Sequence, residues 1–169
     1  MRHDIKQYNP AKPHKWGYKN QVLSGVSGFS YDFDIFAGDQ SNIYPDDASD
    51  LGVSGNVVAR LTETVPRHVN HKIFFNNWFY SPNFQVHLTK IGLLLLSIVR
   101  LNRVPNIAMP TEKELKKQER GFFVAKVATI DNIRVCAITW YDNKPVNILS
   151  TYVGSVPVTK KQRYFKKKK

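Results

Sequence analysis

Two adjacent amides, Asn76 and Asn77, end an apolar run that begins at Ile73. A polar pair at the carboxyl end of a strand often belongs to an active site. Acid–base or metal-dependent chemistry at such a place uses carboxylates, and residues 71–80 contain none. The residues alone leave three interpretations of Asn76 open: a ligand through its amide oxygen, a turn residue that satisfies nearby backbone groups, or the remnant of a lost site.

The other residue types that carry chemistry form no familiar constellation. Metal sites need ligands that converge on one point, whereas the clustered aspartates alternate along one strand face or lie in a loop-like segment, so we interpret them as solvated carboxylates. The five histidines lack metal-ligand spacing, and no nucleophile elbow surrounds Ser97 or another serine. Neither Ser/His nor Cys/His catalysis is predicted. The aspartates are Asp32, Asp34, Asp39, Asp46, Asp47 and Asp50.

Positive charge is concentrated in particular parts of the 169 residues, which carry a net charge of +12. Residues 160–169 contain seven cations and no anion, whereas residues 21–71 contain two cations and seven anions. A basic tail beside a basic domain favours a polyanionic partner, with nucleic acid first. For the tail alone, a solvated segment or a nuclear-import signal is an equally open interpretation.

Neither a disulfide framework nor a membrane segment is expected. Cys136 is the one cysteine, so the chain can form no internal disulfide, which is compatible with a reducing compartment. The most apolar run, Ile91–Val99, has about half the length of a membrane span and is predicted to be a buried strand or helix end. The polar N-terminus shows no signal peptide.

Hydrophobic periodicity predicts an α/β chain. Strands and helices alternate up to Pro105, which is typical of a layered fold with parallel pairing. Beyond it, Thr111 and Glu114 form a capping-box pattern for a helix that Gly121 ends, and a three-stranded antiparallel meander follows. The expected strands are 16–23, 29–35, 71–75, 93–102, 122–130, 133–141 and 146–154, and the expected helices are 54–65, 82–91 and 110–121.

Six phrases in register resemble one family over nearly the whole chain. They are QYNPAKPHKWGYKNQVL, GFSYDFDIFAG, LGVSGNVVARL, HKIFFNNWFYS, IVRLNRVPNIAMPTEKELKKQERG and WYDNKPVNILSTYVG. In this order and spacing they resemble the transposase domain of piggyBac transposable-element-derived proteins. The resemblance implies an RNase H-like DDE core that cuts and joins DNA with three aspartates and two divalent metal ions such as Mg²⁺.

The same resemblance indicates where those aspartates belong. The second stands in a motif of the type F-F-D-N, and here the corresponding residues are Phe75, Asn76 and Asn77. The first precedes a segment similar to Gln7–Pro13, and the third follows a basic stretch similar to Arg163–Lys169. We therefore expect no intact catalytic triad and no metal cofactor in this chain. The implied organisation is a partial core at 1–104, a helix-and-meander insertion at 105–158 and a basic tail at 159–169.

Two functions follow as hypotheses. The first is a catalytically inactive fragment derived from a cut-and-paste DNA transposase. The alternative is a domesticated, non-catalytic DNA-binding module that acts in the nucleus. Its contacts to DNA phosphates would be non-specific and salt-dependent, and the resemblance to the family also allows a homo-oligomer. The candidate contacts are Lys12, Lys15, Lys19, Arg100, Arg103, Lys160, Lys161, Arg163, Lys166, Lys167, Lys168 and Lys169.

Overall fold

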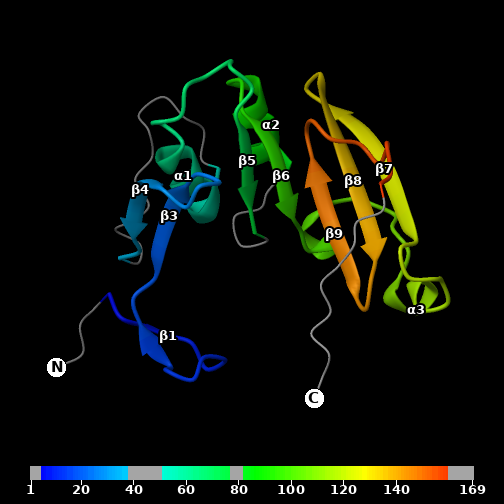
Figure 1. The fold of residues 1–169 in the computed structure, drawn as a ribbon, viewed down its shortest axis with the longest axis horizontal. Coiled ribbons are helices and arrows are strands. Elements are labelled where there is room, and N and C mark those ends of the chain that lie inside the picture. Colours follow the sequence, from blue (N-terminus) through cyan, green and yellow to red (C-terminus); the bar gives the residue numbers. More distant parts are fainter. Residues whose placement is uncertain (1–4, 38–50, 77–81, 160–169) are drawn as a thin grey trace.

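The computed structural model describes residues 5–37, 51–76 and 82–159 (Figure 1). Within these ranges the chain forms two short antiparallel hairpins and one five-stranded mixed sheet. The predicted α/β class is confirmed. The strands and helices, in chain order, are β1 (Gln7–Tyr8), β2 (Trp16–Gly17), β3 (Asn20–Ser24), β4 (Ser30–Ile35), α1 (Val53–Leu61), β5 (Lys72–Phe75), α2 (Pro82–Lys90), β6 (Leu94–Ile98), the 3-10 turn η3 (Leu101–Arg103), α3 (Glu112–Leu115), β7 (Phe123–Ile130), β8 (Ile133–Tyr141) and β9 (Pro145–Ser150).

The five-stranded sheet has the order β5-β6-β9-β8-β7. Strands β5 and β6 are parallel, with Lys72 opposite Leu94, and α2 connects them. Strand β9 pairs antiparallel with β6, so the predicted meander continues the same sheet. The turn between β7 and β8 has the predicted position, and Asp131 and Asn132 adopt φ of 48° and 63°. Such left-handed pairs match the twist of a two-residue hairpin.

The single strand predicted at 16–23 is wrong, because this segment belongs to two hairpins. Trp16 pairs with Tyr8 in the β1–β2 hairpin, whereas Gln21 pairs with Asp34 in the β3–β4 hairpin. The interruption falls at Tyr18 and Lys19. Alternation of apolar residues does not reveal a change of partner, since both pieces remain extended.

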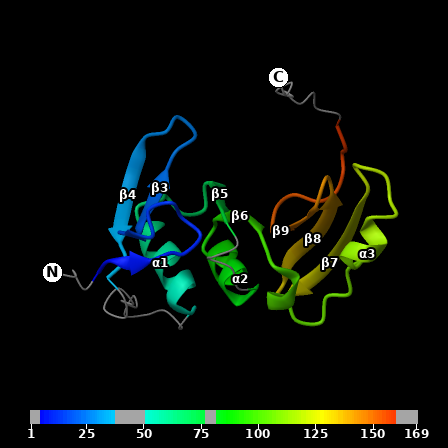
Figure 2. The same cartoon turned by 90° about the horizontal axis from the view of Figure 1, so that it is seen from below.

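Helices α1 and α2 cover the same face of the strands (Figure 2). Their apolar stripes meet the inner side of β5 and β6 in a cluster around Val58, Phe84, Leu88, Leu93 and Leu95. A second cluster, which includes Val86 and Leu149, lies between α2 and the meander. Ser97 is fully buried in β6, and its hydroxyl accepts a hydrogen bond from the amide of Gln85 at 2.6 Å. Ser97 therefore has a structural role, in agreement with the absence of a nucleophile elbow.

Helix α1 ends at Leu61, several residues before the predicted stop at Pro66. The Thr62 hydroxyl donates to the carbonyl groups of Val58 and Ala59, at 2.8 and 3.0 Å. The chain then turns, with the N–H of Val65 bonded to the carbonyl of Thr62. A side chain that bonds to the last helical carbonyl groups competes with continued helix, so the threonine sets this boundary.

The predicted helix 110–121 is reduced to the single turn α3. Its capping box is formed as predicted: the Glu114 N–H donates to the Thr111 hydroxyl, and the Thr111 N–H donates to the Glu114 carboxylate at 2.7 Å. Leu115 is the one buried residue of this helix. Residues 116–120 offer no further apolar position for a stripe, and a short helix without packing is marginal in water.

No helix in the described residues is both long and apolar enough to span a membrane. Ile91–Val99, the most apolar run, includes the turn at Gly92 and strand β6. Cys136 is buried with a free thiol.

Candidate functional site

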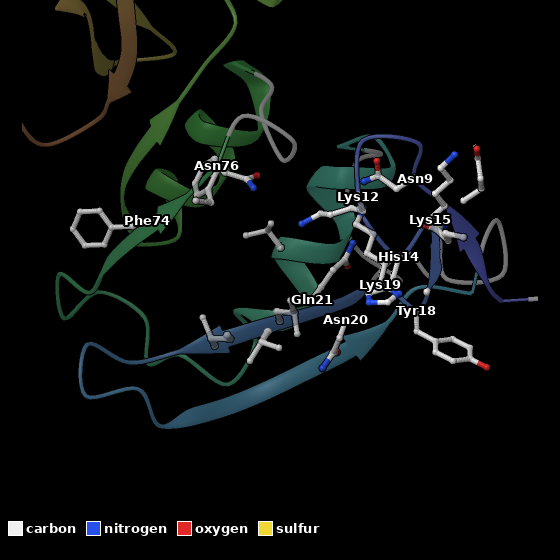
Figure 3. A pocket seen from close by; sticks show the side chains of 18 of the residues that line it. Asn9, Lys12, His14, Lys15, Tyr18, Lys19, Asn20, Gln21, Phe74 and Asn76 are labelled. Carbon is white, nitrogen blue, oxygen red and sulfur yellow. The ribbon is translucent and has the colours of Figure 1, made fainter. Parts of the chain in front are cut away.

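A cavity of about 1020 Å³ lies between β3 and β5 (Figure 3). The β1–β2 hairpin closes one end of it, and α1 forms its floor through Val58, Leu61 and Thr62. Strand β3 contributes residues 20–23, and the other wall is formed by residues 73–76 at the end of β5. We refer to this space as the β3–β5 cavity.

Three basic side chains of the cavity come from the turn between β1 and β2. The amide oxygen of Asn9 accepts from the Ala11 N–H at 3.1 Å, and the Asn9 N–H donates to the Lys15 carbonyl at 2.6 Å. These bonds fold residues 9–15, which include two prolines, back on themselves, so that Lys12, His14 and Lys15 line the cavity. Figure 3 shows the Lys12 side chain extending from this turn towards β5.

Lys19, which lies between β2 and β3, is the most enclosed basic side chain of the cavity. Its ammonium group lies 5.1 Å from the centre of the Phe36 ring, a distance suited to a cation–π contact. Burial lowers the pKa of Lys19, because the charged form loses hydration there. No Asp or Glu lines the β3–β5 cavity among the described residues. The cavity is therefore an electropositive space suited to an anionic group.

Asn76 lies at the rim of this cavity, immediately after β5. Its position is fixed by the strand before it: the ring of Phe75 packs edge-on against Phe84 of α2, with 5.6 Å between ring centroids. The Asn76 side chain is exposed and neutral. It therefore supplies an amide oxygen, but none of the negative charge that a carboxylate would bring.

The residues around Asn76 do not fit a pair of divalent metal ions. Two dications need several carboxylates to compensate their charge, whereas the described residues of this cavity offer neutral amides and a set of cations. In the described ranges, no three His, Cys, Asp or Glu side chains come together in a group that could hold a metal ion.

Part of the predicted DNA-contact set is brought together by the fold. Lys12, Lys15 and Lys19 converge on the β3–β5 cavity, as described above. Arg100 and Arg103 are exposed after β6 and at the end of η3, and they do not line this cavity. The remaining predicted contacts lie outside the described residues: Lys160, Lys161, Arg163, Lys166, Lys167, Lys168 and Lys169.

The interpretation of the aspartates as solvated carboxylates is wrong for Asp34. Its carboxylate forms an ion pair at 3.2 Å with Arg60 of α1, and its side chain is 21% exposed. The polar face of β4 is turned towards α1, so Asp34 meets the helix rather than bulk water. Asp32 accepts a hydrogen bond from the neighbouring Phe33 N–H at 2.7 Å. The other four, Asp39, Asp46, Asp47 and Asp50, lie outside the described residues.

Gln21 is a cavity residue that the sequence did not indicate. It is 6% exposed, and its amide oxygen has no hydrogen-bond partner. In the sequence, a glutamine between Asn20 and Val22 is indistinguishable from a residue on a solvated strand face. Only the position of β3 above α1 shows that this side chain is enclosed.

Comparison with known proteins identifies the family. A family model described as Transposase IS4 matches residues 1–169, which is the whole chain. The chain belongs to this transposase family, as a member of the piggyBac type. The human PiggyBac transposable element-derived protein 2 is 32% identical over 163 residues, which cover 94% of this chain and 26% of the relative. Human PiggyBac transposable element-derived protein 3 is 29% identical, over 99% of this chain and 28% of its own length.

A solved structure shows the same fold. The piggyBac transposase in a synaptic complex with hairpin DNA, determined by cryo-electron microscopy, superposes with a TM-score of 0.68 at 19% identity. The match covers 94% of this chain and 32% of that transposase. This piggyBac-type chain thus spans about a quarter to a third of the length of these proteins, and the RNase H-like fold expected from the resemblance is confirmed.

Proposed function

We propose that this piggyBac-type domain is a catalytically inactive derivative of a DNA cut-and-paste transposase. The observation that carries the proposal is the set of side chains at the end of β5: Asn76 is neutral, and the described residues that line the cavity beside it include lysines and no carboxylate. Phosphodiester cleavage by two metal ions needs both ions held close together by clustered negative charge. The sequence resemblance assigns a metal-binding aspartate to position 76, where this chain has asparagine.

Asn76→Asp is therefore expected to leave the chain without DNA-cleaving activity. One carboxylate beside three lysines still leaves two dications uncompensated, since it supplies a single negative charge. The measurement is conversion of supercoiled plasmid to the nicked form, with Mg²⁺ or Mn²⁺, by the unmodified chain and by the variant. A metal-dependent nickase on the same plasmid serves as the positive control. Metal-dependent nicking by the unmodified chain would contradict the proposal.

A second candidate function is non-catalytic DNA binding, with nonspecific contacts to phosphates. The convergence of Lys12, Lys15 and Lys19 on one electropositive cavity favours it. A related transposase is described in complex with hairpin DNA, which supports the same class of partner here. Lysines reach phosphate oxygens without reading bases, so we expect little sequence preference.

Salt dependence measures how many phosphates these lysines contact. We expect the Lys12→Gln/Lys15→Gln double variant to bind duplex DNA more weakly. The slope of log K against log[salt] should also become less steep by up to about 1.8, because each lost phosphate contact reduces the slope by about 0.9. The measurement is fluorescence anisotropy at a series of salt concentrations. Lys113→Gln, at an exposed position in α3, is the matched control, and its affinity for duplex DNA should fall less than twofold. Equal slopes for all three chains would contradict a role for the cavity lysines.

A nuclear location and self-association are the remaining parts of this proposal. A derivative that binds chromosomal DNA would act in the nucleus, and the basic run at 160–169 has the composition of a nuclear-import signal. Sedimentation of the purified chain over a tenfold concentration range tests whether it forms homo-oligomers.

A further inference from the structure

Strand β7 forms one outer edge of the five-stranded sheet. Within the described residues it pairs with β8 alone, so its other side has no strand neighbour there. An unpaired edge presents a row of backbone N–H and C=O groups that another extended chain can bind. Strand β7 contains eight residues, which is enough to hold an added strand of about five or six residues.

The hydrogen-bond pattern identifies the backbone groups of β7 that point outward. The Tyr141 N–H donates to the Phe122 carbonyl, so the backbone of Phe122 is directed towards β8. Alternation along the antiparallel pair then directs the backbone groups of Ala125, Val127 and Thr129 away from β8. These three residues provide the hydrogen-bonding groups of the outer edge.

Exposure along β7 shows which part of this edge is accessible. Residues 126–129 are exposed, whereas residues 123–125 are partly covered. Figure 2 shows α3 beside the start of β7. Val127 is 52% exposed, although a large apolar side chain in a sheet is normally covered by its cross-strand neighbours. The second half of β7 is therefore the part where an added strand can lie.

A groove of about 570 Å³ lies between α3 and the start of β7, and we refer to it as the α3–β7 groove. Phe122, Val124 and Lys126 line it, and because they alternate they share one face of the extended chain. Met109 and the buried Leu115 of α3 make the rest of the groove largely apolar. A large apolar side chain from a strand paired with β7 can enter this groove.

Lys126 determines the charge of the occupant. It is exposed at the groove and forms no ion pair with the described residues. Glu114 is the one carboxylate among the described residues that line the groove, and it already accepts from the Thr111 N–H and hydroxyl at 2.7 and 2.9 Å. A carboxylate opposite Lys126 would therefore supply the missing counter-charge. Two copies of this chain, each with a net charge of +12, would instead repel each other.

We propose that the outer edge of β7 binds an extended acidic segment of a partner protein as an added antiparallel strand. Antiparallel addition continues the pairing of β7 with β8, and it is more stable per residue than parallel addition. The segment runs opposite to β7, so its residue facing Lys126 comes two positions before its residue facing Val124. The first residue is acidic and the second is large and apolar, which gives the pattern Asp/Glu-x-Phe/Leu.

This surface shares no lining residue with the β3–β5 cavity in the described part of the chain, so the inference does not rest on the proposed function. The probe is the peptide Thr-Val-Asp-Thr-Phe-Thr-amide, labelled with fluorescein at its N-terminus for anisotropy titrations against the full chain. In the proposed register its aspartate faces Lys126, and its phenylalanine faces Val124 and enters the groove.

Two altered peptides test the register. Alanine in place of the phenylalanine should weaken binding at least about tenfold, because the groove then lacks its apolar anchor. Proline in place of the threonine between the aspartate and the phenylalanine should abolish measurable binding. That threonine faces Ala125, and proline would remove the N–H that donates to the outward carbonyl of this residue.

A charge reversal tests the contact with Lys126. We expect Lys126→Glu to weaken binding at least about fivefold, and a peptide with lysine in place of the aspartate to restore the affinity. Lys113→Glu is the matched control, because it changes the net charge equally at an exposed position of α3 that does not line the groove. It should change the affinity less than twofold. Equal losses in the two variants would overturn the proposal, since only the overall charge would then attract the peptide.

Amide hydrogen exchange of the unmodified chain tests the strand pairing without any variant of the protein. Saturating peptide should slow exchange at Ala125, Val127 and Thr129 at least about tenfold. Exchange at Lys126 and Ala128 should change much less, because their N–H groups already face β8. Absence of peptide binding or a uniform change along β7 would overturn the proposal. The same holds if the three outward amides are protected without peptide in a concentration-dependent dimer, because a second copy would then occupy the edge.

Discussion

Phe84→Ala is expected to lower the free energy of unfolding by about 3–5 kcal/mol, which is a large part of the total stability of a domain of this size. Phe84 is fully buried and lies where α1, α2 and β5 meet. Its ring contacts Phe75 edge-on and lies against Gly55 of α1, where even an added Cβ would come within 3.4 Å of the ring. Truncation to alanine therefore leaves a cavity that the surrounding backbone cannot close.

The measurement is urea denaturation followed by circular dichroism. Phe29→Ala is the matched control, because Phe29 is 65% exposed and contacts Tyr31 at the surface of the β3–β4 hairpin. That variant should cost less than about 1 kcal/mol. If the two variants lose equal stability, Phe84 does not occupy the centre of the core.

Gly92→Ala is expected to cost on the order of 3 kcal/mol, through strain and steric overlap together. Gly92 has φ of 87° and closes the end of α2: its N–H donates to the Thr89 carbonyl, while the Leu93 N–H donates to the Leu88 carbonyl. This pair of bonds is a Schellman motif, whose left-handed residue is usually glycine. A Cβ at Gly92 would also lie 2.6 Å from the Cα of His68, so the adjoining backbone would have to move.

Gly28→Ala separates the two contributions. Gly28 has nearly the same φ, 86°, but nothing lies within 4 Å of the position of its Cβ. It should therefore show only the conformational cost of about 1 kcal/mol. Thermal melts of both variants and of the unmodified chain give the loss of stability in each variant. We attribute the larger loss in Gly92→Ala to the contact with His68. Equal melting temperatures for the two variants would contradict that contact.

Much of the local structure was predictable because its causes are local. The capping box of Thr111 and Glu114, the left-handed pair Asp131–Asn132 and the glycine after α2 depend on residues a few positions apart. The α/β class followed from hydrophobic periodicity, and six phrases in register indicated the family that the comparisons confirm. The predicted division at residues 104 and 158 stays a prediction, although β9 pairs with β6 across the first of these boundaries.

Apart from the end of α1, which Thr62 sets locally, the errors in the prediction depend on the tertiary surroundings of a segment. Residues 16–23 form two strands since Tyr8 and Asp34 lie opposite them. Asp34 is not solvated, since α1 brings Arg60 to it. The helix after Thr111 stops after one turn, since only Leu115 meets an apolar surface. Alternation and propensity show that a face is polar or apolar, but not what covers it.

The sequence by itself determined the family, the neutral residue at position 76 and the basic character of the chain. These are properties of residue identity and order, and folding does not change them. The tertiary structure alone decided that Lys12, Lys15, Lys19 and Asn76 share one cavity, because they belong to the β1–β2 turn, the link between β2 and β3 and the residue after β5, which only the fold brings together. It also decided which strands pair, because β3 pairs with β4 and β5 with β6 in the described part of the chain only after folding brings them together.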